Sequence, residues 1–383
     1  MPSIYLDWAA SAPPWQDLLQ DFVLTSQELY ANTSSKHTAG KLASLRLETS
    51  RTMLAEALQC PTERLYFTSG GTEADHIPLL ACLLKTGKQS IVISGIEHSA
   101  IDEQANMLAS LGVDVRRVRP DGDGFIDPAA FSAAVSKDTS FVSVMTVNNE
   151  TGAIQPIAAI VKAVAEASKG SRKPFFHTDA VQALGKIPFS PGTLGVDGAA
   201  FSAHKLGGPR GIGALYLSKP LRVLATGGGQ ESSIRSGTHN LAGAEALAKA
   251  TARACAHSGK AQDLARLLET RLIEGISSIP GATVVPATRK AGDPRYSPFI
   301  LCASFPGLGG ETMMRVLDDA GIAVSTGSAC SSGKQERRVL NAMGVDRDIS
   351  FASIRISTGR NSSAGDIDTF LEMAASLYAR FKT

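Results

Sequence analysis

Short β-rich runs alternate with helical patterns through the first two-thirds of the chain, and this alternation restricts the possible folds more than any other feature. Helical patterns at 98–110, 127–136 and 156–168 separate the runs. Strands and helices that alternate at this spacing predict an α/β fold with a mostly parallel sheet, covered by helices on both faces. The predicted strands are RLYFTS (64–69), SIVIS (90–94), VDVRRV (113–118), SFVSVMTV (140–147), KPFFHTD (173–179), DGAAFSA (197–203) and GIGALYL (211–217).

The pattern changes at about residue 240. Two long helical patterns are followed by strands that lie farther apart, which indicates a second, smaller α+β domain. The pattern does not assign residues 1–30 to either part. The helices of the second part are predicted at 240–257, 261–278, 310–320 and 364–381, and its strands at 299–305 and 352–357.

Composition favours a globular protein without a strongly charged partner. Apolar residues make up 43% of the 383 residues, and the net charge of +2 gives no reason to expect a nucleic acid or a membrane surface as partner. The five cysteines form no CxxC pair and no metal-ligand spacing, so we expect no metal site and reduced thiols, as in a cytoplasmic protein. We also expect neither a signal peptide nor a membrane span, which would need about 20 apolar residues in a row.

Polar residues follow several predicted strands at their carboxyl ends, where open α/β sheets bind ligands. SGGT (69–72) opens a helix whose free N–H groups can hold a phosphate, although a glycine turn capped by Thr72 has the same sequence. His98 and Asp179 also follow strands, and each could simply stabilise a turn. Lys205 precedes glycines rather than acidic residues, and a buried lysine can act as an amine nucleophile.

Together these residues predict a site for pyridoxal phosphate (PLP). The turn at 69–72 would hold the phosphate, and His98 would cover the ring. Asp179 would pair with the protonated pyridine nitrogen, and Lys205 would form a Schiff base. Because all four follow strands of one predicted sheet, the combination favours PLP more than any single residue does.

Cys330 lies in STGSACSSGK (325–334), among serines and glycines. A buried cysteine behaves as a small apolar residue, so this polar setting is unusual. The residues themselves allow two interpretations, a loop cysteine without a function or a nucleophile on a flexible tether. The other cysteines lie in apolar or helical patterns and are predicted to pack in the core: Cys60, Cys82, Cys255 and Cys302.

Ten stretches along nearly the whole chain resemble the cysteine desulfurases, a branch of the fold-type I, class V aminotransferase-like PLP enzymes. They are YLDWAASAP (5–13), ANTSSKHTAG (31–40), FTSGGTEADH (67–76), IEHSA (96–100), VNNETGAIQP (147–156), HTDAVQALGK (177–186), FSAHKLGGPRGIGALY (201–216), GGGQESSIRSGTHN (227–240), STGSACSSG (325–333) and ASIRISTGR (352–360).

The resemblance implies a role for each candidate residue. Lys205 would bind PLP covalently, Asp179 would hold the pyridinium proton, and His98 would stack on the ring and assist proton transfers. The phosphate would be held by Gly71, Thr72, Ser202 and His204, with Thr238 reaching it from a partner subunit; Gln182 and Asn149 would contact the cofactor, and Asn32 and Arg355 would bind the substrate carboxylate.

The implied reaction removes sulfur from L-cysteine, giving L-alanine and a persulfide on Cys330. The small residues around Cys330 would let it collect sulfur at the cofactor and deliver it to an acceptor protein, either an Fe–S scaffold or an enzyme of tRNA thiolation. The resemblance also implies a homodimer that contacts neither nucleic acid nor a membrane directly. A selenocysteine lyase, a cysteine-sulfinate desulfinase, an aminotransferase of the same fold and a non-catalytic sulfur-transfer scaffold remain alternatives.

The implied architecture is the PLP-dependent transferase fold type I. A large domain, residues 16–250, would contain a mostly parallel seven-stranded sheet and the PLP site. A small α+β domain, residues 1–15 and 251–383, would carry the loop with the catalytic Cys330.

Overall fold

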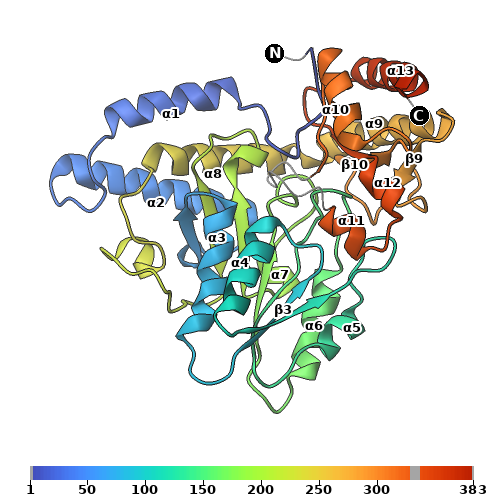
Figure 1. Cartoon of the computed structure of the whole chain (residues 1–383). Helices are drawn as coiled ribbons and strands as arrows, with labels where there is room; N and C mark the ends of the chain where they lie inside the picture. The colour runs from blue at the N-terminus through green and yellow to red at the C-terminus, as the bar shows by residue number, and fades with distance from the viewer. Residues whose placement is uncertain (1–2, 328–336, 382–383) are drawn as a thin grey trace.

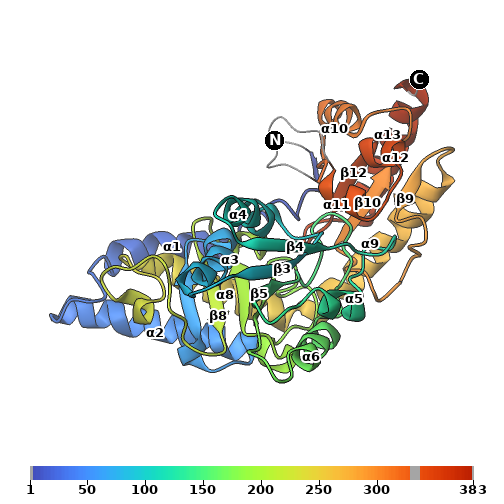
Figure 2. The ribbon, with the colours of Figure 1, turned by 60° about the horizontal axis from the view of Figure 1, so that its bottom comes forward.

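Residues 3–327 and 337–381 are described by a computed structural model of the chain. A large sheet and a small sheet each have their own helices (Figure 1). Turned by 60°, the molecule shows α1 and α2 at one end and the small sheet with α10 and α13 at the other (Figure 2). No helix in the described ranges is long and apolar enough to cross a membrane.

The large sheet has seven strands in the order β2-β8-β7-β6-β5-β3-β4. It is mostly parallel, which confirms the predicted fold class; β8 runs antiparallel to both of its neighbours, β2 and β7. The strands are β2 (Leu65–Thr68), β3 (Ser90–Ser94), β4 (Asp114–Val118), β5 (Thr139–Ser143), β6 (Phe175–Asp179), β7 (Gly198–Ser202) and β8 (Gly213–Leu217).

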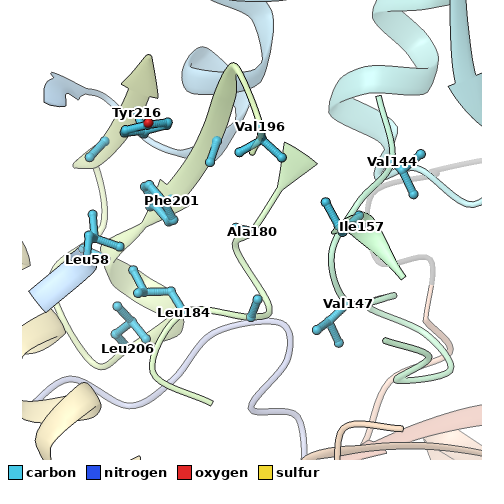
Figure 3. Close-up of a cluster of buried hydrophobic side chains, with 14 of the residues drawn as sticks. Leu58, Val144, Val147, Ile157, Ala180, Leu184, Val196, Phe201, Leu206 and Tyr216 are labelled. Atoms are coloured by element: carbon cyan, nitrogen blue, oxygen red, sulfur yellow. The ribbon is translucent and has the colours of Figure 1, made fainter. Parts of the chain in front are cut away.

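Helices cover both faces of this sheet because its side chains alternate between two apolar clusters. On β8, Ala214 and Tyr216 pack in the cluster with Leu58 of α2, whereas Leu215 packs with Ala74 of α3. Figure 3 shows Leu58, Phe201 and Tyr216 in the first cluster. The helices around the sheet are α1 (Gln16–Glu28), α2 (Thr38–Leu58), α3 (Gly71–Leu80), α4 (Ser99–Ser110), α5 (Pro128–Ala133), α6 (Ile157–Ala167), α7 (Pro191–Leu194) and α8 (Leu241–Ala256).

The small sheet is antiparallel, in the order β12-β10-β9, and its helices pack on it around a separate apolar cluster. The predicted strands at 299–305 and 352–357 correspond to β10 and β12. The elements are α9 (Ser258–Ser278), β9 (Thr283–Val285), β10 (Ile300–Ser304), α10 (Gly310–Asp319), β11 (Ile322–Ala323), α11 (Arg338–Ala342), α12 (Arg347–Phe351), β12 (Ser353–Ser357) and α13 (Ala364–Phe381).

The N-terminal residues, which the sequence pattern left unassigned, contact both parts of the molecule. β1 (Ile4–Tyr5) pairs in parallel with β11. Both α1 and α2 pack against α8. The sequence pattern did not predict the helix α2. Short 3-10 helices complete the described elements: η1 (Thr62–Arg64), η2 (Ala81–Leu84), η3 (Ala203–Lys205) and η4 (Gln230–Ser233).

Candidate active site

The carboxyl ends of β3, β6 and β7 lie at one edge of the large sheet, because β3, β5, β6 and β7 are parallel to one another. His98 follows β3, Asp179 is the last residue of β6, and Lys205 follows β7 in η3. His98 and Lys205 both lower the pKa of the Asp179 carboxyl by their charges, so these three side chains share one local environment.

Asp179 is a buried carboxyl group at the end of β6. Its Oδ1 accepts a hydrogen bond of 2.9 Å from the backbone N–H of Val181. Burial raises the pKa of Asp179 above its ordinary value, and His98, the Val181 N–H and Lys205 oppose this rise. A cation beside this carboxyl would therefore stabilise its ionised form, and a protonated pyridine nitrogen is such a cation.

Lys205 is held by the N-terminal segment. Its Nζ donates to the carbonyl oxygens of Ala9 and Ala10, each at 2.7 Å. Gln182 Nε2 donates to the same Ala9 oxygen at 2.9 Å. Residues 9 and 10 are alanines and carry no functional side chain; the signal for them in the sequence is that they lie in the stretch 5–13, which resembles the family.

His98 caps the N-terminus of α4. Its Nδ1 accepts a hydrogen bond of 3.1 Å from the Ala100 N–H, so the neutral ring carries its proton on Nε2. Burial lowers the pKa of His98; Asp179 opposes this effect, whereas Lys205, Arg338 and Arg355 add to it. His98 can therefore present Nε2–H as a donor while Nδ1 is occupied.

The N-terminus of α3 fits a phosphate. No side chain caps this helix, so the first N–H groups of Gly71 and Thr72 are available. A Cβ on Gly71 would lie 2.8 Å from Val181 Cγ2 and 3.7 Å from Ser202 Cβ, so only glycine lets the helix start this close to the ends of β6 and β7. Thr72 is exposed and Ser202 is buried.

His204 and a lysine that the sequence analysis missed lie near Lys205. His204 Nδ1 is 3.3 Å from Ser11 Oγ, and burial, with Lys205 and Lys186 nearby, lowers the pKa of His204 to about 4. Lys186 Nζ donates to Gln182 Oε1 at 2.6 Å, and burial lowers the pKa of Lys186 to about 7. Lys186 lies four residues after Gln182, a helical spacing that could have identified it.

A buried pair that the sequence analysis also missed joins the phosphate end of this site to the Asp179 end. His177 Nε2 lies 2.9 Å from Asp75 Oδ1, and the two side chains are 0% and 1% exposed. Asp75 lies one turn after Gly71 in α3, and His177 lies two residues before Asp179 in β6. Asp75 therefore lies on the same face of α3 as Gly71, and His177 lies on the same side of β6 as Asp179. These spacings could have revealed the pair from the sequence.

Arg355 is the candidate group for a substrate carboxylate. Its Nη1 donates to the Asn149 carbonyl oxygen at 3.0 Å and its Nη2 to Asp7 Oδ1 at 2.7 Å. Its Nε is buried and has no hydrogen-bond partner among the described residues. Asn149 thus meets Arg355 through its backbone, and the guanidinium retains a donor for a further acceptor.

Asn32, predicted to bind the substrate carboxylate together with Arg355, is not brought next to it. Asn32 lies in the turn between α1 and α2, where its Oδ1 accepts from the Ser34 N–H at 2.9 Å. This turn is at the end of the molecule opposite the small sheet in both views (Figures 1 and 2). Thr238 is exposed and lines a small cavity of about 60 Å³ together with Ser69.

Cys330, the predicted nucleophile, lies outside the described residues. The other four thiols have pKa values above the ordinary range because burial raises them, to about 12 for Cys302. Such thiols stay protonated at neutral pH and are weak nucleophiles. The remaining three are Cys60 and Cys82, both raised to about 11, and Cys255.

Comparison with known proteins identifies the family. The profile described as aminotransferase class-V matches residues 4–370. The chain belongs to this family. It is 34% identical to "Cysteine desulfurase IscS" of Dictyoglomus turgidum, over 99% of this chain and 95% of that protein. It is 36% identical to "Cysteine desulfurase" of Cereibacter sphaeroides, over 97% of this chain and 95% of that one.

A solved structure named "NIFS-LIKE PROTEIN" superimposes with a TM-score of 0.90 at 34% identity, covering 99% of this chain and 100% of the other. Together these matches confirm the resemblance to the cysteine desulfurases and the predicted fold class.

Proposed function

We propose that this chain is a PLP-dependent cysteine desulfurase, which converts L-cysteine to L-alanine and keeps the sulfur as a persulfide on Cys330. The observation that carries this proposal is that Lys205, Asp179 and His98 meet at one sheet edge in a chain whose curated relatives are named cysteine desulfurases.

The residues present fit PLP. Its phosphate would bind at the N-terminus of α3, at Gly71 and Thr72, with Ser202 and His204 completing the binding site. Asp179 would bind the ring nitrogen, Lys205 would hold the cofactor covalently, and contacts to the ring would come from Gln182, Asn149 and His98. When bound, the cofactor supplies an electron sink for the bonds of the substrate α-carbon.

The protein's own groups orient the substrate and move protons. Arg355 would bind the carboxylate of L-cysteine, for which its buried Nε is an available donor. Lys205 Nζ would take up and return the proton of the α-carbon, while the carbonyls of Ala9 and Ala10 offer it a fixed position when it is not bound to the cofactor. His98 would hold a proton at Nε2.

Sulfur transfer requires Cys330. Its thiolate would attack the substrate sulfur, so that a sulfur–sulfur bond forms and the bond between the substrate β-carbon and sulfur breaks. The electron pair of the broken bond remains with the carbon, which takes up a proton and leaves as part of L-alanine. We further propose that an acceptor protein of Fe–S assembly or tRNA thiolation removes the persulfide sulfur in the cytoplasm, without direct contact with nucleic acid.

We also propose that residues 16–250 form the large domain and that residues 1–15 and 251–383 form the small one. Ile4 and Leu6 support this division, because they pack in one apolar cluster with residues from 268 onward. The chain would act as a homodimer. Asn32 supports a dimer, because it lies far from Arg355 in its own chain and a second copy could bring it to the substrate. Thr238 would reach the phosphate from the partner subunit.

The test is to load the protein with PLP, add L-cysteine, and measure alanine and the residue that gains a sulfur atom. We expect alanine from the wild type, an added sulfur on Cys330, and no alanine from Cys330→Ala, whereas the control Cys60→Ala behaves as wild type. A Cys330→Ala variant that still releases alanine would refute the persulfide route. Cys330-independent release of alanine from selenocysteine or cysteine sulfinate alone would favour the related lyases instead.

A further inference from the structure

Two adjacent arginines, Arg337 and Arg338, contact different parts of the molecule. They are the first described residues after the gap at 328–336. Arg338 begins α11 and reaches the turn between β3 and α4: its Nη1 donates to the Gly95 carbonyl at 2.9 Å, and its Nη2 donates to the Glu97 carbonyl. Its Nε lies 3.3 Å from Asp102 Oδ2 in α4. Arg338 therefore binds both sides of the turn that leads into His98.

The other polar groups of this turn have hydrogen-bond partners of their own among the described residues. The carbonyl between the two, that of Ile96, accepts from Asn148 Nδ2 at 3.1 Å. The buried side chain of Glu97 accepts from Ser94 Oγ at 2.6 Å and from the Met145 N–H at 2.9 Å. Among the described residues, the guanidinium of Arg338 is the side-chain donor that binds the carbonyls of Gly95 and Glu97.

Arg337 points to the small sheet. Its Nη2 donates to the Ser353 carbonyl at 2.5 Å, at the start of β12 and two residues before Arg355. A Cβ on Gly310 would lie 2.8 Å from this Nη2, so the absence of a side chain there leaves room for the buried guanidinium. Arg337 also acts on Glu150: burial raises the pKa of the Glu150 carboxyl, and the charge of Arg337 opposes this rise more than those of Arg355 and Arg338 do.

The two arginines thus connect the elements that carry two predicted site residues. The turn at 95–97 presents His98, and β12 presents Arg355. Arg337 and Arg338 are neighbours in the chain, so the two contacts start from adjacent points of one backbone segment.

We propose that Arg337 and Arg338 are positioning residues: Arg338 fixes the turn that presents His98, Arg337 fixes the strand that presents Arg355, and the pair sets where these two groups lie relative to each other. The inference rests on the proposed function only for the roles of His98 and Arg355 in turnover.

The kinetic test compares Arg338→Lys, Arg338→Gln and Arg337→Gln with a matched control, Arg117→Gln. Arg117 binds the same Asp102, at 2.9 Å, but neither carbonyl of the turn. Loss of position at His98 should lower kcat for L-cysteine about tenfold in both Arg338 variants, with KM changed less than about twofold. Loss of position at Arg355 should raise KM about tenfold in Arg337→Gln, and the control should keep both constants.

A second readout needs neither cofactor nor turnover. In the PLP-free protein with ¹³C-labelled histidine, the His98 ring signal, identified with His98→Asn, can be followed by NMR against pH. The charged groups that act on His98 are Asp179, Lys205, Arg338 and Arg355. Arg338→Gln should shift the signal and raise its titration midpoint, because a cation is lost. Arg338→Lys should shift the signal with a smaller change of midpoint, and Arg117→Gln should leave it unchanged.

The outcomes separate the two proposals. If Arg338→Lys keeps the wild-type kcat and His98 signal while Arg338→Gln does not, the effect is one of charge alone and the positioning role is overturned. An unchanged His98 signal in both variants also overturns it. If the wild type releases no alanine but the His98 signal moves as expected, the positioning role stands and the proposed function fails.

Discussion

The buried pair of Asp75 and His177 offers a test of how the PLP site is supported. Burial, followed by the charges of Asp179 and Glu97, raises the pKa of Asp75 well above its ordinary value. Burial lowers the pKa of His177 to about 3. At neutral pH the imidazole of His177 is therefore neutral, so the contact is not an ion pair, and the raised pKa of Asp75 favours a protonated carboxyl group beside it.

This protonation state predicts a small loss of stability for one substitution of Asp75 and a larger loss for another. Asp75→Asn replaces one neutral group by another of the same shape that can still bond to His177, so it should cost less than about 1 kcal/mol of unfolding free energy. Asp75→Ala leaves His177 Nε2 without a partner, and Nδ1 of the same ring already has none among the described residues. An unsatisfied buried group with the accompanying cavity should cost about 3 kcal/mol.

The assay is urea and thermal unfolding of the two variants beside the wild type. With an unfolding entropy of about 2.1 cal/mol/K per residue over 383 residues, a loss of 3 kcal/mol lowers Tm by about 4 °C. Asp75→Ala should also weaken PLP binding, because Asp75 connects α3 to the strand of Asp179. If Asp75→Asn loses 3–5 kcal/mol, the cost of breaking a buried ion pair, the pair is charged and the reasoning is refuted.

Two further predictions concern the phosphate end of the site. Gly71→Ala brings a Cβ to 2.8 Å from Val181 Cγ2 and should weaken PLP binding about tenfold in an absorbance titration. The control Gly70→Ala, whose Cβ meets nothing within 4 Å, should keep the wild-type affinity for PLP. Equal affinity of both variants would contradict the close approach at Gly71. The pKa of His204 is about 4 in the folded chain, below its unfolded value, so the unfolded state binds more protons between these values and stability falls as pH falls from about 6.5 towards 4. Urea midpoints measured across this window should fall less steeply with pH in His204→Asn, and parallel curves would contradict the assignment.

The sequence predicts the large sheet well because long periodic segments carry a strong signal. The helices at 98–110 and 156–168 are found as α4 and α6 within a residue, and each predicted strand of the large sheet is present. Since parallel strands end at one edge, the predicted parallel sheet also brought His98, Asp179 and Lys205 to one edge. β1 and β11 were not predicted because two residues are too few to show a periodicity. The pattern also did not predict α2, although this helix has 21 residues.

No local sequence pattern predicts the contacts between residues that are far apart in the chain. The backbone carbonyls that bind Lys205 come from alanines, whose identity gives no sign of an acceptor role. Asp7 and Arg355 are 348 residues apart in the chain, so no local pattern predicts their 2.7 Å contact. Asp75 and His177 are 102 residues apart and each looks like an ordinary polar residue of its own element.

The short segment 7–10 explains how the residues proposed to bind the cofactor and the substrate can share one support. Ala9 accepts hydrogen bonds from both Lys205 and Gln182 through its carbonyl oxygen, and its N–H donates to Ser357 Oγ at 2.9 Å. Asp7, two residues earlier, binds Arg355. A displacement of this segment would therefore move the acceptors of Lys205 and the partner of Arg355 at the same time. The N-terminal residues thus connect β12 of the small sheet, which carries Arg355, to Lys205 of the large one.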